Sequence, residues 1–200
     1  MRRTEDEAQQ TRRDILDAAL SAFSSKGYAA TRLEEVAEKA KVTRGAVYHH
    51  FVSKSDLYLA VIEDAEKDAQ QAINLAIAGG GSFTEILERI LLTSFDLLES
   101  DTRFRKAFVL TQETQRLKPI KMRGRQQAVG LVKAIAGYME QGMAQGQIRS
   151  DADPANLARA FLAYQNGLIE LWLANPKAFS IKQQASAFAD LLLNGFASRD

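Results

Sequence analysis

A short run of the chain carries side chains that suit contact with nucleic acid. Arg44 has a planar fork of donors that matches O6 and N7 of guanine, worth about 1 to 3 kcal/mol of discrimination between bases. Tyr48 and Lys54 suit hydrogen bonds to phosphate, and His49 suits a base edge or a stacking contact. Gly45 lets a backbone approach DNA without a Cβ in the way. Each residue alone is ordinary on a surface, but together they favour a nucleic-acid interface.

The distribution of charge supports this interpretation more than the total does. The chain of 200 residues has a formal net charge of only +1, which is not the basic balance typical of nucleic-acid binders. Residues 39–54, however, contain four Lys or Arg residues and no acid. A second basic stretch, residues 116–133, is also free of acids, and we expect it to form a solvated face.

Other kinds of site are disfavoured. The adjacent His49 and His50 point about 100° apart on a helix, whereas helical zinc ligands need i,i+4 spacing, so we expect no metal. No recognisable motif combines a nucleophile, a base and an orienting group. No strand precedes Gly79–Gly81 and no Gly-Lys-Ser/Thr follows it, so a flexible connection is favoured over a phosphate loop, and we expect no cofactor.

Composition also limits the location of the protein. The absence of cysteine excludes a disulfide framework and fits a reducing compartment, so a cytoplasmic protein is expected. No run of about 18 apolar residues is present, and the N-terminus lacks the apolar core of a signal peptide, so no membrane contact is expected.

The elements that position the reading residues are predicted to be helices, in an all-α fold. The first helix ends at a C-cap, Gly27, and the second begins at a capping box, Thr31-Arg-Leu-Glu34. A third helix, capped by Thr43, follows a tight turn, which completes a helix-turn-helix. Val47 and Phe51 lie within about 40° of each other on this helix and face the core, which leaves the opposite face for DNA.

Helical patterns continue to the end of the chain. A long fourth helix starts at Ser53 and reaches about Ala78, and a capping box of Ser82 and Glu85 starts the next helix. The further helices are predicted over about 83–100, 101–119, 120–146, 154–174 and 181–197. The predicted organisation is a helix-turn-helix DNA-binding domain, residues 1–55, joined by the long helix to a helical ligand-binding and dimerisation domain, residues 56–200.

The N-terminal sequence resembles the TetR/AcrR family of bacterial repressors. The matching residues are Arg13-Asp-Ile-Leu-Asp-Ala-Ala, Phe23, Gly27-Tyr-Ala-Ala-Thr31, Val36-Ala37, Val42-Thr-Arg-Gly-Ala-Val-Tyr-His-His-Phe51 and Lys54-Ser-Asp-Leu57. The resemblance implies a homodimer on a pseudo-palindromic operator, released by a small-molecule inducer, and is nearest the drug-efflux branch. It places these residues against DNA: Thr31, Thr43, Arg44, Gly45, Tyr48, His49 and Lys54. His49 departs from the family pattern, in which tryptophan is common.

Two further sets of residues are predicted outside the helix-turn-helix, which we call the reading head. The last two helices carry more apolar residues than a monomer easily buries, which predicts a dimer interface of Leu157, Phe161, Leu168, Leu171, Ile181, Phe188, Leu192 and Phe196. The position of Glu66 resembles an acidic site that drug-responsive relatives use for cations, and candidate pocket residues beside it are Phe95, Phe104, Phe108 and Trp172. The simpler interpretation of Glu66 is an exposed residue paired with Lys67 or a nearby base, and that of the aromatic residues is core.

A different class of function stays open at this point. The chain could be an all-helical enzyme or an adaptor without DNA binding. The lack of a catalytic motif argues against the enzyme. A glycine beside an arginine at a helix N-terminus has no use in a purely structural bundle, which argues against the adaptor.

Overall fold

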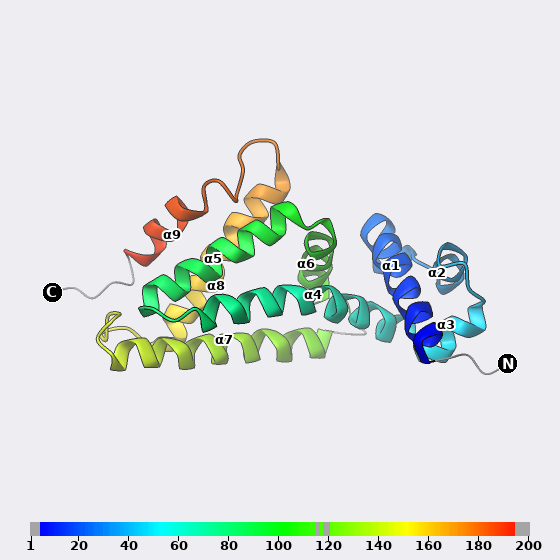
Figure 1. The fold of residues 1–200 in the computed structure, drawn as a ribbon, viewed down its shortest axis with the longest axis horizontal. Coiled ribbons are helices and arrows are strands. Elements are labelled where there is room, and N and C mark those ends of the chain that lie inside the picture. The colour runs from blue at the N-terminus through cyan, green and yellow to red at the C-terminus, as the bar shows by residue number, and fades with distance from the viewer. Residues whose placement is uncertain (1–4, 115–116, 118–120, 195–200) are drawn as a thin grey trace. The chain divides into compact units, whose positions relative to one another are not determined.

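The computed structural model describes residues 5–114, 117 and 121–194, and for residues 68 and 121–128 it describes the backbone alone. Within these ranges the chain forms nine helices and no strand, which confirms the predicted all-α fold (Figure 1). None of the described helices combines the length and the apolar composition that crossing a bilayer requires. The helices belong to two compact units, a first of Met1–Asp68 with Arg103–Met122 and a second of Ala69–Thr102 with Arg123–Asp200.

The first unit contains the predicted helix-turn-helix. Its helices are α1 (Glu5–Ala30), α2 (Leu33–Lys39), α3 (Arg44–His50), the first part of α4 (Lys54–Ala78) and most of α6 (Thr102–Thr114). α1 is interrupted at Gly27, whose φ of 75° is one that L side chains rarely adopt, so the regular helix ends at the predicted glycine. Lys41 has a φ of 56° in the tight turn between α2 and α3.

One apolar core joins these helices. Its most deeply buried members come from every helix of the first unit: Ile15, Leu16, Phe23, Val36, Val47, Phe51, Leu57, Tyr58, Ala107 and Leu110. The hydroxyl of Tyr58 donates a hydrogen bond to the carbonyl oxygen of Leu110 at 2.8 Å, so α6 is joined to α4 by a polar contact inside this core. Arg103 also pairs with Asp17 of α1 and Asp64 of α4. α6 is therefore an integral part of the unit that carries the reading head.

The predicted N-cap of the third helix at Thr43 is confirmed, whereas the predicted capping box at Thr31 and the predicted start of the last helix near 181 are not. The Ser82 hydroxyl accepts from the Glu85 amide at 3.3 Å while the Glu85 carboxylate accepts from the Ser82 amide at 2.7 Å, as a capping box requires. The capping box predicted at Thr31 is wrong. α2 begins at Leu33 without a side-chain cap, because the Thr31 hydroxyl donates instead to the Gly27 carbonyl oxygen at 2.8 Å.

The second unit contains the end of α4, with α5 (Phe83–Ser100), most of α7 (Lys121–Ala144), α8 (Pro154–Ala174) and α9 (Ala185–Leu193) (Figure 1). α9 packs along α5. Gly80 and Gly81, with φ of 65° and 102°, make the predicted break after α4. Residues 181–184 form turns, so the last helix begins at Ala185 rather than near 181, and its predicted end at 197 lies outside the described residues.

Candidate DNA-reading surface and effector site

α3 is held in place by one buried face. Val47 is 0% exposed and Phe51, which follows the helix, is 2% exposed. The Thr43 hydroxyl accepts a hydrogen bond from the Ala46 amide at 3.1 Å and so caps the helix as predicted. The helix is short, but both of its ends and one of its faces are fixed by the first unit.

The opposite face of α3 is open to solvent. The side chains of Arg44, Tyr48 and His49 are exposed, as are Thr43 and Gly45. A Cβ added at Gly45 would meet only the Thr43 hydroxyl, at 3.8 Å, which is an ordinary van der Waals contact. The fold itself therefore does not require glycine at this position, which leaves close approach of a ligand as its use.

Arg44 contacts two neighbours on this surface. Its guanidinium donates to the Tyr48 hydroxyl at 3.4 Å and lies 5.4 Å from the centre of that ring. Its other terminal nitrogen lies 3.0 Å from a carboxylate oxygen of Glu34 in α2. The hydrogen bond to Tyr48 and the charge of Glu34 raise the pKa of Arg44. The sequence indicated Glu34 only as part of a capping box and did not pair it with Arg44, because no helical periodicity links two helices separated by a turn.

Lys54, at the start of α4, reaches back to the end of α1. Its ammonium donates to the carbonyl oxygens of Thr31 at 2.7 Å and Ala29 at 3.1 Å, and it lies 4.6 Å from the centre of the Tyr28 ring. Burial lowers the pKa of Lys54. An ammonium has three donors, so one N–H remains beyond the two carbonyl contacts.

Thr31 differs from the other residues that the resemblance assigns to DNA. It is only 1% exposed, and its hydroxyl is used by the Gly27 carbonyl oxygen. Its side chain lies inside the first unit because the chain turns there between α1 and α2. The carbonyl oxygen of Thr31, in contrast, is one of the two that hold Lys54.

Glu66 lies on α4 where α6 packs against it. Its side chain is half-buried, and one carboxylate oxygen accepts a hydrogen bond from the Thr111 hydroxyl at 3.0 Å. Burial raises the pKa of Glu66. Among the described side chains no Lys or Arg forms an ion pair with Glu66, and Lys67 instead pairs with Asp64 at 3.6 Å. Within the described residues, Glu66 therefore does not fit the simpler interpretation of an exposed residue paired with Lys67 or a nearby base.

The four aromatic candidates divide between the two units. Phe104 and Phe108 are half-buried on α6 in the first unit, with ring centroids 6.5 Å apart. Phe95 and Trp172 are 0% and 3% exposed and belong to the second unit. Phe95 packs edge-on against Phe188 at 6.4 Å between centroids, as a core residue does.

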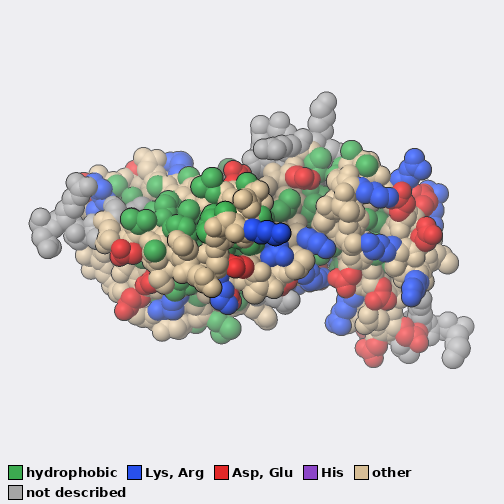
Figure 2. All heavy atoms as spheres, turned by 90° about the horizontal axis from the view of Figure 1, so that it is seen from above, with side chains coloured by type: hydrophobic (Ala, Val, Ile, Leu, Met, Phe, Trp, Pro, Cys, Tyr) green, Lys and Arg blue, Asp and Glu red, His purple; other side chains and the backbone are tan. Residues whose placement is uncertain are grey.

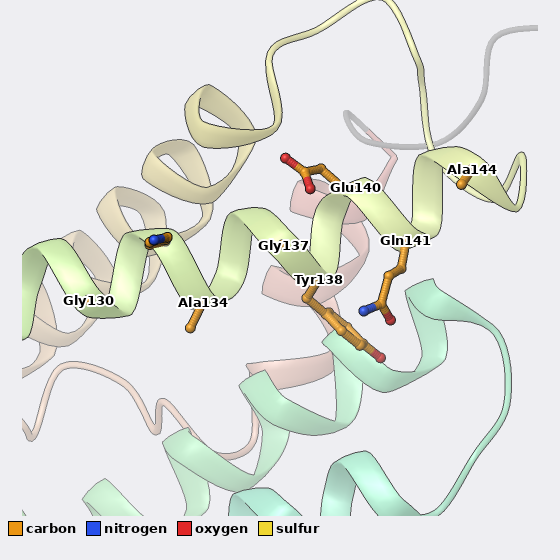
Figure 3. A pocket seen from close by; sticks show the side chains of 8 residues that line it. Gly130, Ala134, Gly137, Tyr138, Glu140, Gln141 and Ala144 are labelled. Atoms are coloured by element: carbon orange, nitrogen blue, oxygen red, sulfur yellow. The ribbon is translucent and has the colours of Figure 1, made fainter.

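A hollow of about 820 Å³ runs along α7 in the second unit (Figure 3). Its lining comes from this helix alone: Gly130, Lys133, Ala134, Gly137, Tyr138, Glu140, Gln141 and Ala144. Tyr138 and Gln141 project from one side of the helix and Glu140 from another. The Tyr138 ring lies 4.7 Å from that of Phe83 on α5. This is an open groove on a helix surface rather than an enclosed site.

The residues predicted for a dimer interface divide into two groups. Leu157, Phe161 and Ile181 are at most 7% exposed and belong to the core of the second unit, because α8 and the turn before α9 pack there. Leu168, Phe188 and Leu192 are half-buried, Leu171 is exposed, and Phe196 lies outside the described residues. Figure 2 shows hydrophobic side chains gathered in the region of α8 and α9. The basic stretch 116–133 lies largely outside the described side chains.

Comparison with known proteins agrees with this geometry. Residues 15–61 match the bacterial regulatory proteins of the tetR family, and residues 85–197 match the C-terminal region of MAATS-type transcriptional repressors. The chain is 30% identical over 196 residues to the HTH-type transcriptional regulator TtgR of Pseudomonas putida, covering 95% of this chain and 93% of TtgR.

Solved structures give the same result. The chain is 26% identical to SmeT, the repressor of the Stenotrophomonas maltophilia multidrug efflux pump SmeDEF, with a TM-score of 0.76 over 94% of this chain and 92% of SmeT. NalD, the secondary repressor of the MexAB-OprM multidrug efflux pump in Pseudomonas aeruginosa, shares the fold at 24% identity, with a TM-score of 0.79 over 96% of this chain and 98% of NalD. The family and these relatives are transcriptional regulators, not enzymes. The chain belongs to the TetR family of bacterial regulatory proteins, and it is a ligand-responsive transcriptional regulator that binds DNA.

Proposed function

We propose that the chain is a cytoplasmic repressor that binds a pseudo-palindromic operator as a homodimer and leaves it when a small molecule binds. The observation that carries the proposal is the division of α3 into two faces. Val47 and Phe51 fix the helix to the core, while Arg44, Tyr48 and His49 stand in solvent. A helix with one anchored face and one face of donors is suited to enter the major groove.

Each exposed residue has a separate role in this proposal. Arg44 reads a guanine, His49 contacts a base edge or stacks, and Tyr48 and Thr43 contact phosphates. Gly45 allows the backbone to approach the groove. Lys54 contacts a phosphate through its remaining N–H, while Thr31 contributes only through the carbonyl oxygen that holds Lys54.

We place the functional division at the start of α4. Residues 1–55 form the DNA-binding domain, and residues 56–200 form the ligand-binding and dimerisation domain. The extents of the two family matches, 15–61 and 85–197, support a division in this part of the chain. α6, which packs in the first unit beside α4, is then a part of the ligand-binding domain that lies in the same unit as the reading head.

The homodimer is proposed to form through α8 and α9. Leu171 of α8 and Leu191 of α9 are 66% and 69% exposed, and large exposed apolar side chains are typical of interaction surfaces. Leu168, Phe188 and Leu192 are the half-buried residues of the proposed interface. Two reading heads related by a two-fold axis match an operator with two half-sites, about 34 Å or one DNA turn apart.

The small molecule is proposed to be a lipophilic cation that meets Glu66. A half-buried carboxylate without a basic partner among the described residues favours a positive ligand, since an unpaired charge away from water is costly. Phe104 and Phe108 on α6 supply apolar surface in the same unit. SmeT has been solved in complex with triclosan, so a ligand without positive charge is the alternative to test beside cations.

The proposal is tested with a DNA duplex that wild-type protein selects from a random library. Arg44→Ala combined with Tyr48→Ala should abolish selective binding in fluorescence anisotropy while circular dichroism shows an unchanged fold. A lipophilic cation should weaken the binding of wild-type protein to the duplex. Selective binding by the double variant would contradict the assignment of α3 as the reading helix.

A further inference from the structure

An acid lies directly beside the proposed reading arginine. Glu34 is in the first turn of α2, and its carboxylate oxygen is 3.0 Å from a terminal nitrogen of Arg44. The same guanidinium donates to Tyr48 and lies over the Tyr48 ring. Arg44 is therefore already partnered before any DNA arrives.

The pair has little use for the stability of the fold. Its two side chains are 62% and 51% exposed, and ion pairs this open to water contribute little to stability. The neighbouring Glu35 has a different partner, Lys26 of the same unit, at 2.8 Å. Glu34 instead raises the free energy that is needed to move the Arg44 guanidinium onto another acceptor.

We infer that Glu34 is a selectivity residue, which competes with DNA for Arg44 and so weakens binding wherever the DNA lacks a correctly placed guanine. The inference rests on the proposed function of Arg44 as a base-reading residue. When Arg44 moves to a phosphate, it exchanges its ion pair with Glu34 for one bond of similar kind to a phosphate oxygen. The Glu34 charge is then left unpaired beside the DNA backbone. The guanidinium has five N–H donors, so Arg44 can donate to both acceptors of guanine while one N–H stays on Glu34, and the pair is kept on the operator.

The consequence is a penalty that falls mainly on non-specific complexes. Without the Glu34 charge, Arg44 can contact any phosphate, which adds a contact that the wild-type protein lacks on random DNA. On the operator, Arg44 contacts guanine with or without Glu34. Removal of the Glu34 charge should therefore reduce the ratio of specific to non-specific affinity.

The test compares Glu34→Gln with Glu38→Gln, a matched loss of one exposed charge on the same helix. The probes are a duplex that wild-type protein selects from a random library and a scrambled duplex of the same composition. In fluorescence anisotropy Glu34→Gln should bind the scrambled duplex about threefold or more tighter, with a smaller gain on the selected duplex. Glu38→Gln should change both by the same factor.

A second comparison asks whether the effect passes through Arg44. In an Arg44→Ala background, Glu34→Gln should change both duplexes by the same factor, as Glu38→Gln does. The inference is overturned if Glu34→Gln leaves the affinity ratio of wild-type protein unchanged, or if the ratio falls equally in the Arg44→Ala background. If wild-type protein selects no sequence at all, the proposed function fails and the inference fails with it.

Discussion

The carboxylate of Glu66 in α4 accepts a hydrogen bond from the hydroxyl of Thr111 in α6 at 3.0 Å, in a half-buried position. Burial raises the pKa of Glu66 above its ordinary value of 4.5, so the folded protein favours the neutral acid. The stability gained from the neutral form is complete below pH 4.5 and is lost as the pH rises through the higher pKa of the folded state.

Glu66→Gln should therefore stabilise the protein at neutral pH. Glutamine keeps an acceptor for Thr111 but never ionises, so the gain in Tm over wild-type protein should be present at pH 7 and should disappear below pH 4.5. Thermal unfolding followed by circular dichroism across this range measures the difference. A Glu66→Gln variant that is less stable than wild-type protein at pH 7 would count against a costly charge at this position.

A cation bound at Glu66 should displace its proton. Positive charge lowers the pKa of a nearby carboxyl, so proton release should accompany binding at pH values between 4.5 and the raised pKa of the folded protein. Titration calorimetry with a lipophilic cation, in two buffers that differ in ionisation enthalpy, reports the number of protons. Triclosan, which carries no positive charge, serves as the comparison ligand. The site assignment is wrong if proton release is equal in Glu66→Gln and wild-type protein.

Substitutions of Arg44 and of Lys54 should impair DNA binding in different ways. Arg44→Ala should reduce the preference for the selected duplex, whereas Lys54→Ala should weaken all sequences alike and flatten the log-log salt dependence by about one unit. Lys54→Ala should also lower stability by about 1 kcal/mol, because the carbonyl oxygens of Ala29 and Thr31 lose a donor. Salt titrations of both variants measure these effects. An unchanged slope for Lys54→Ala would contradict the proposed phosphate contact of Lys54.

Gly142 should be intolerant of a side chain. A Cβ there would lie 2.8 Å from two atoms of the Phe83 ring, which is 4% exposed and packed against Tyr138. Gly142→Ala should therefore destabilise the protein by about 1 to 3 kcal/mol through overpacking. Gly137 in the same helix has nothing within 4 Å of an added Cβ, so Gly137→Ala should stabilise by up to about 1 kcal/mol. Denaturant unfolding of both variants checks the contrast.

The dimer proposal predicts that charge on α8 or α9 separates the protomers. Leu171→Glu and Leu191→Glu place a carboxylate on side chains that are 66% and 69% exposed. Both variants should sediment as monomers at concentrations where wild-type protein is a dimer. Leu75, which is 74% exposed at the end of α4, supplies the control Leu75→Glu, which should leave the dimer intact. Sedimentation of the wild-type protein as a monomer at micromolar concentration would contradict the proposed dimer.

Sequence patterns were most informative where the physics is local. The caps at Thr43 and Ser82 depend on residues three apart, and both are present in the structure. Thr31 shows the limit of such reasoning, because its hydroxyl donates to the Gly27 carbonyl oxygen and does not accept from an amide of α2. A capping motif does not show which of two local hydrogen bonds the side chain forms.

Contacts between distant helices were not predictable. Glu66 was singled out, but its partner Thr111 depends on how α6 packs against α4. The pairing of Glu34 with Arg44 depends on the angle between α2 and α3. Amphipathic patterns also identify apolar residues without showing what covers them, which is why Leu157 and Ile181 proved to be core residues of the second unit.

The most direct test of the central claim is the selection of DNA fragments from the source genome by the wild-type protein, followed by footprinting. We predict that one or a few fragments are enriched, each with an inverted repeat whose half-sites lie about one helical turn or more apart. The same selection with the Arg44→Ala and Tyr48→Ala double variant should enrich none of them. Equal recovery of all fragments by the wild-type protein, with affinity that depends on salt but not on sequence, would contradict the account.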